Sequence, residues 1–102
     1  MSRRVTSLRR LYNFLAVVVL SAPDRFARED YLKDEDQLNL DRAFEELFYG
    51  MQFVREKIKD ETEVTRLRGV LQDSYAAYKA GDAKRGAWLL QDFEKAVFSS
   101  LH

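Results

Sequence analysis

The chain has 102 residues, 46% hydrophobic and 33% charged, a balance typical of one soluble globular domain and unlike that of a disordered chain. Its 17 bases and 17 acids give a formal net charge of zero, which disfavours a protein that binds nucleic acid over its whole surface. The chain has no cysteine, and its only histidine is His102. This composition excludes disulfides and thiol catalysis, and we expect a cytoplasmic protein without a zinc site.

The first predicted element is a helix over about residues 7–21, ended by Pro23. Apolar side chains at helical spacing cover nearly all of its second half: Leu8, Leu11, Tyr12, Phe14, Leu15, Val17, Val18, Val19 and Leu20. This pattern is typical of a central helix that is packed on several sides. Arginines precede the apolar run, as in a secretory signal, but Pro23 argues against cleavage there. The run is also shorter than the roughly 20 residues of a membrane span, so we expect no membrane segment.

Residues 24–38 are assigned to a loop or a short helix. From residue 24 to residue 46 the chain has nine acids and four bases, a local charge of −5. This acidic middle favours a basic partner, although a solvated acidic surface is the alternative. A calcium loop that starts at Asp30 is excluded, because Leu32 and Glu35 stand where an EF-hand needs an acid and a glycine.

A second helix is predicted over about residues 39–59. Apolar residues alternate there at spacings of four and three and form one seam: Leu40, Phe44, Leu47, Met51, Val54 and Ile58. Gly50 lies close to this seam, and we expect it to permit a close helix crossing.

Two further helices are predicted over about residues 61–80 and 83–99. Asp60 stands three residues before Glu63, the spacing of a capping box. Gly81 suits the end of the third helix, and Asp82 suits the start of the fourth. Their short link makes these helices antiparallel neighbours. The fold class is therefore all-α, a single domain that forms a small, mostly antiparallel four-helix bundle.

No motif in the sequence identifies a reaction. The chain has no glycine-rich phosphate loop, and the inward Glu-x-x-His pairs of a di-metal bundle are absent. Glu45 and Glu46 are paired carboxylates, but their helix positions lie away from the seam and indicate a solvated face. We predict a protein that is not an enzyme and has no cofactor and no metal site.

Three aromatic residues are not explained by the predicted core. At 100° per residue, Tyr49 lies nearly opposite the seam of its helix, Phe53 lies about 120° from it, and Trp88 lies about 140° from the apolar stripe of the last helix. Aromatic rings among charges are typical of binding hot spots, although Trp88 could instead pack against the domain. The predicted partner-binding residues are Asp34, Asp36, Glu45, Glu46, Tyr49, Phe53 and Trp88.

The sequence therefore favours a non-catalytic protein-binding module that occludes a basic partner. In size, helical content and the acidic stretch 30–41, the chain resembles the all-helical immunity proteins of bacterial contact-dependent growth inhibition. The resemblance implies a cognate toxin, such as a nuclease, as the partner, and it transfers no site residue. Two alternatives remain: a structural or regulatory homodimer, and a nucleic-acid accessory protein that uses arginines near the N-terminus: Arg3, Arg4, Arg9 and Arg10.

Overall fold

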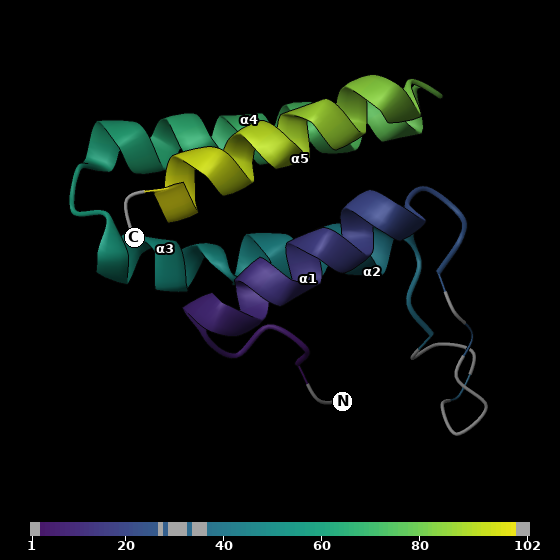
Figure 1. The fold of residues 1–102 in the computed structure, drawn as a ribbon, viewed down its shortest axis with the longest axis horizontal. Coiled ribbons are helices and arrows are strands. Elements are labelled where there is room, and N and C mark those ends of the chain that lie inside the picture. Colours follow the sequence, from purple (N-terminus) through teal and green to yellow (C-terminus); the bar gives the residue numbers. More distant parts are fainter. Residues whose placement is uncertain (1–2, 27, 29–32, 34–36, 100–102) are drawn as a thin grey trace.

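The computed structural model of the chain describes residues 3–26, 28, 33 and 37–99. Within these residues the helices are α1 (Leu8–Ser21), α2 (Leu40–Tyr49), α3 (Met51–Lys57), α4 (Glu61–Lys79) and α5 (Ala83–Phe98) (Figure 1). The described part of the chain contains no strand, which confirms the predicted all-α class.

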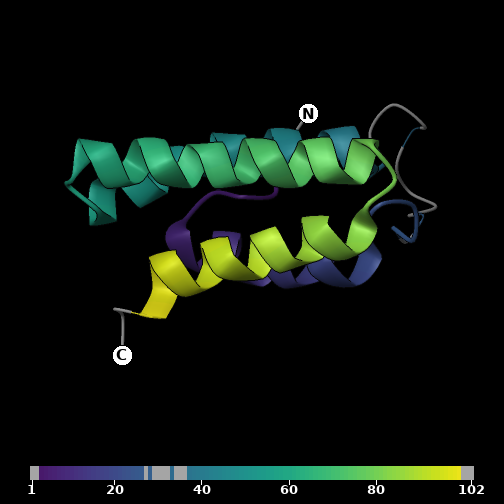
Figure 2. The same cartoon turned by 90° about the horizontal axis from the view of Figure 1, so that it is seen from above.

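The helices form a closed four-helix arrangement, in which α2 and α3 together count as one member. α1 packs against α2 and α5, and α4 packs against the same two helices. Chain direction reverses from each of these four members to the next, so neighbouring members are antiparallel (Figure 1). Figure 2 shows two layers, with α4 beside α2 and α3 in one and α5 beside α1 in the other. The predicted antiparallel bundle is confirmed.

The core lies between the two layers and is formed by the apolar stripes that the sequence indicates. In the α2–α3 seam, Phe44, Leu47, Met51 and Val54 are buried. α1 contributes Leu11, Leu15 and Val18, α4 contributes Val64, Leu67 and Leu71, and α5 contributes Leu90, Phe93 and Val97. Burial of these stripes is the main favourable contribution to folding.

α1 is not the central helix that its sequence predicts. Leu20 is 80% exposed and Val17 is 43% exposed. The reason is geometric: α1 has neighbours on two sides, so its outer side meets solvent although apolar residues occur there. Its predicted end is confirmed, because α1 stops at Ser21 and Ala22, the residue before Pro23, is extended.

Gly50 divides the predicted helix 39–59 into α2 and α3. A Cβ atom on Gly50 would lie 3.0 Å from both Leu11 Cδ1 and Val5 Cγ1. The missing side chain therefore lets α1 and the segment before it approach α2 closely, as predicted. The segment predicted as one helix over about residues 39–59 therefore forms two helices, the second of which ends at Lys57, before the extended Ile58.

The α4–α5 hairpin has the ends that its sequence predicts. The Asp60 carboxylate accepts hydrogen bonds from the backbone N–H groups of Thr62 and Glu63. Gly81 has a φ of +86°, a conformation that glycine adopts without strain. The N–H of Asp82 donates to the Ala77 carbonyl at 2.8 Å, and that of Gly81 donates to Tyr78 at 3.1 Å. These bonds form a Schellman motif that ends α4.

A close contact that the sequence did not indicate joins α4 to α5. A Cβ atom on Gly86 would lie 2.6–2.9 Å from atoms of the Tyr78 ring. Beside it, the Ser74 hydroxyl donates a 2.7 Å hydrogen bond to the Gly86 carbonyl. The glycine thus provides the space for a buried tyrosine at the helix interface.

Candidate partner-binding surfaces

Glu46 does not lie on a solvated face, and this sequence-based expectation is wrong. Glu46 is only 6% exposed. One carboxylate oxygen, Oε1, accepts hydrogen bonds from the backbone N–H groups of Arg4 (2.9 Å) and Val5 (3.1 Å). The segment before α1 crosses α2 at this point, and its N–H groups need an acceptor there because they are partly or fully buried. Glu46 therefore attaches the segment before α1 to α2 and is not available to a partner.

Arg3 completes this attachment, and we call Arg3, Glu45, Glu46 and Tyr49 the N-terminal clamp. The Arg3 guanidinium lies 3.2 Å from Glu46 Oε2 and 3.5 Å from Glu45 Oε1. It also stands 4.3 Å above the centroid of the Tyr49 ring, a cation–π distance. Glu45 and Tyr49 keep 52% side-chain and 38% residue exposure, respectively, but each already has an internal partner.

Phe53 is half-buried and packs against the core cluster, so it is less available than its predicted position suggests. Its ring meets Tyr49 edge-on, with 6.3 Å between the centroids. It also lines a shallow open pocket with Thr6, Leu8 and Glu56. Asp34 and Asp36, the other acids predicted to bind a partner, lie outside the described residues.

Trp88 is 61% exposed, which settles the alternative that the sequence left open in favour of exposure. With Asp82, Lys84 and Arg85 it lines a shallow open pocket of about 460 Å³ on α5. α5 and α2 belong to different layers (Figure 2). The structure therefore brings Glu45, Tyr49 and Phe53 together but places Trp88 elsewhere.

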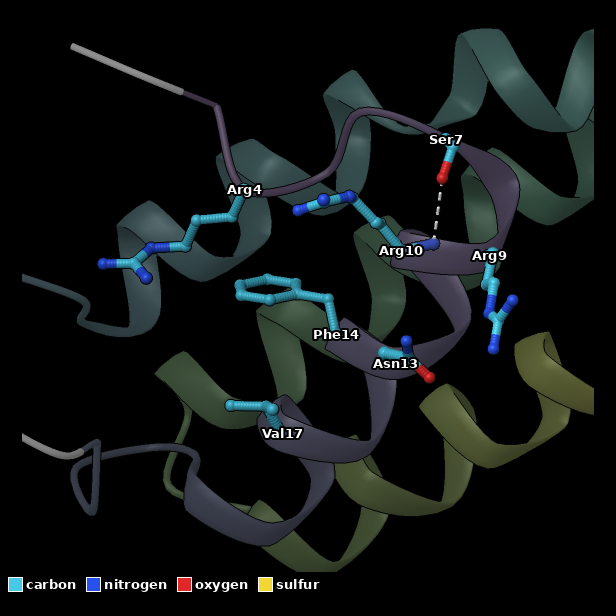
Figure 3. Close-up of a pocket in the computed structure, with 7 residues that line it drawn as sticks. All are labelled: Arg4, Ser7, Arg9, Arg10, Asn13, Phe14 and Val17. Carbon is cyan, nitrogen blue, oxygen red and sulfur yellow. Dashed lines mark hydrogen bonds between the residues drawn. The ribbon is translucent and has the colours of Figure 1, made fainter.

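A further pocket, which we call the α1 groove, was missed by the sequence analysis. It has a volume of about 430 Å³ and opens to solvent along the first half of α1 (Figure 3). Its lining residues are Arg4, Ser7, Arg9, Arg10, Asn13, Phe14 and Val17. The signal that could have found it is the absence of any acid between residues 3 and 23, which leaves four arginines without a local counter-charge.

A polar cluster joins α2 to the end of α4. The Tyr75 hydroxyl donates a hydrogen bond to Asp41, and Lys79 Nζ lies 3.0 Å from the same carboxylate. The bond from Tyr75, followed by that from Lys79, lowers the pKa of Asp41 below its ordinary 3.8. The same carboxylate raises the pKa of Tyr75 above 10.0 and that of Lys79 above 10.5.

Within residues 3–26, 28, 33 and 37–99, no three histidine, aspartate or glutamate side chains are close enough to hold a metal ion. In the same part of the chain, no helix has the length and apolar character needed to cross a membrane. Comparison of the chain with protein-family models, curated protein sequences and solved structures finds no significant match.

Proposed function

We propose that this chain is a non-catalytic protein-binding module and, most concretely, an immunity-type inhibitor that occludes a basic partner such as a nuclease toxin. The observation that carries the proposal is the 61% exposure of Trp88. Tryptophan is enriched among residues that dominate binding energy, because a rigid ring covers a large area with little loss of conformational entropy. A small domain that leaves its only tryptophan at the surface has a strong candidate anchor for a partner.

The basic character of the partner rests on fewer residues than the sequence indicates. Glu46 is removed from the partner-binding set by its burial, and Glu45 and Tyr49 remain on the outer side of α2. A basic partner would have to compete with Arg3 for Glu45. Because α2 and α5 belong to different layers, the contributions of Glu45 and Trp88 must be tested separately.

The test is affinity capture with the immobilised chain, followed by titration of each captured protein after its purification. Trp88→Ala should weaken binding by about 2 kcal/mol, roughly 30-fold, which is the size of a hot-spot truncation. Gln91→Ala, an exposed change on the same helix, is the matched control and should leave the affinity unchanged. Equal affinity of the wild type and the Trp88→Ala variant would contradict the proposal.

The partner's charge is tested by Glu45→Lys. A basic partner at this surface should bind the variant more weakly, and added salt should reduce the difference. If Glu45→Lys changes nothing while Trp88→Ala weakens binding, the basic-partner form fails and the protein-binding proposal stands. Capture of only a second copy of the chain, or of nucleic acid that high salt removes, would replace the proposal with a homodimer or a nucleic-acid accessory protein.

A further inference from the structure

The α1 groove combines three arginine side chains, those of Arg4, Arg9 and Arg10, with an apolar floor. In Figure 3, Arg10 extends from α1 past the Phe14 ring toward Arg4, which comes from the segment before the helix. Arg9 and Asn13 point toward the other side of α1. Phe14 is almost buried, Val17 is partly exposed beside it, and Leu20 continues the exposed apolar surface one turn further along the helix.

The positive charge of the groove is not neutralised within the described part of the chain. The guanidinium groups of Arg4, Arg9 and Arg10 have no carboxylate within ion-pair distance there, whereas Arg3 has two. These arginines are therefore available to anionic groups from outside the domain.

We propose that the α1 groove binds an acidic segment of a partner protein, whose carboxylates pair with Arg4 and Arg10 and whose apolar side chain packs on Phe14 and Val17. Arginine pairs well with carboxylates because its planar donors match the two oxygens. The N-terminal clamp shows the same chemistry inside the molecule, since one helix presents Glu45, Glu46 and Tyr49 to a single arginine. This site is separate from Trp88 and does not depend on the proposed function.

An acidic protein segment fits this groove better than a nucleic acid does. A phosphate backbone is bound by a track of cations, but α1 has no lysine or arginine after Arg10. The surface beyond Arg10 instead presents Val17 and Leu20, which phosphates cannot use and leucine-like side chains can.

The probe for this proposal is a labelled, acetylated and amidated peptide in which glutamate pairs alternate with leucine pairs. Its binding to the full chain is followed by fluorescence anisotropy at low salt. We expect the double change Arg4→Glu and Arg10→Glu to weaken binding about tenfold or more, because two attractive contacts become repulsive. Val17→Asp should weaken it several-fold, because it places a carboxylate on the apolar floor.

Folding of the double variant is not endangered at position 10. Ser7 caps α1 through the N–H of Arg10, so Arg10→Glu creates the Ser-x-x-Glu pattern of a capping box. The matched control is Arg55→Glu with Lys59→Glu, which makes the same charge change at two exposed positions that line none of the pockets described above. This control should keep the wild-type affinity, and circular dichroism should show unchanged helicity in both double variants.

Three results would overturn the proposal. Equal weakening in the two double variants would show that net charge alone attracts the peptide. Equal affinity for a peptide with glutamine in place of glutamate would show that the groove does not recognise carboxylates. Tighter binding of single-stranded DNA, undiminished by Val17→Asp, would assign the groove to nucleic acid.

Discussion

The N-terminal clamp and the α1 groove are formed by neighbouring arginines that have opposite fates. Arg3 lies between two carboxylates and an aromatic ring, so its charge is satisfied inside the domain. Arg4 gives only its backbone N–H to the clamp, and its side chain lines the groove with Arg10. A run of like charges is therefore not one functional unit, because the contact with α2 neutralises Arg3 and leaves the side chains of Arg4 and Arg10 at the surface.

The largest effect should come from Glu46→Ala, which breaks the clamp. Two backbone N–H groups and Arg3 lose their acceptor, and we expect the free energy of unfolding to fall by about 3 kcal/mol. Glu46→Gln should cost only about 1 kcal/mol, because an amide oxygen in place of Oε1 can accept both N–H bonds. Urea denaturation measures both values. Equal, small losses for the two variants would mean that the clamp does not hold the segment.

Gly86→Ala alters the contact between α4 and α5, which contains neither the N-terminal clamp nor the α1 groove. It should lower the free energy of unfolding by about 2 kcal/mol. The new methyl group overlaps the Tyr78 ring, and this overpacking outweighs the better helix propensity of alanine. Gly69→Ala is its control and should stabilise the protein by about 0.5–1 kcal/mol, because the new Cβ meets no atom within 4 Å beyond its chain neighbours and its own helix backbone.

A comparison of Gly86→Ala with Glu46→Ala distinguishes a specific coupling between the N-terminal clamp and the α1 groove from general destabilisation. Gly86→Ala should leave the affinity of the acidic peptide unchanged. Glu46→Ala should lower that affinity several-fold, because Glu46 positions the backbone of Arg4. Similar affinities for the two variants would separate the clamp from the groove.

Trp88→Ala should change the free energy of unfolding by no more than about 0.5 kcal/mol, since the side chain is mostly exposed. Thermal melting of the variant beside the wild type measures this. A large loss of stability would show that Trp88 belongs to the fold and is not available to a partner.

The smallest change in stability is expected for the cluster of Asp41, Tyr75 and Lys79. Like the groups of the N-terminal clamp, these groups have partners inside the molecule, but they lie at the surface. Because the pKa of Asp41 is lowered, its stabilising contribution is present above pH 3.8 and is lost as the pH falls through the folded-state value. The pKa of Tyr75 is raised, so its contribution is present below pH 10.0 and is lost as the pH rises further. Melting of Asp41→Asn and the wild type should therefore differ slightly at neutral pH and converge in acid. A constant difference at all pH values would contradict this assignment.

The sequence predicted the features of the fold that depend on neighbouring residues. The caps at Asp60 and Asp82, the turn at Gly81 and the α2–α3 seam all follow from residues within a few positions of one another. The contact of Gly86 with Tyr78 could not be derived in this way, because it depends on how closely α4 and α5 approach.

The candidate surfaces were less predictable, for the same reason. Helical spacing correctly placed Tyr49 on the outer side of its helix, but it left open whether Trp88 is exposed or packed. It failed for Glu46, because the acceptor and its donors are more than 40 residues apart and no local pattern links them. It also treated Val17 and Leu20 as buried, because apolar character alone does not show how many neighbours a helix has.

We propose that Arg3 is satisfied inside the domain, whereas Arg4 and Arg10 are available to a partner. The most direct test is an NMR spectrum of the Nε–Hε groups of these arginines, recorded with and without the acidic peptide. We predict that the Arg3 signal is displaced by the Tyr49 ring in the free protein and does not move on titration, whereas the Arg4 and Arg10 signals shift with the peptide. Movement of Arg3 together with Arg4 and Arg10, or no movement of Arg4 and Arg10, would contradict this account.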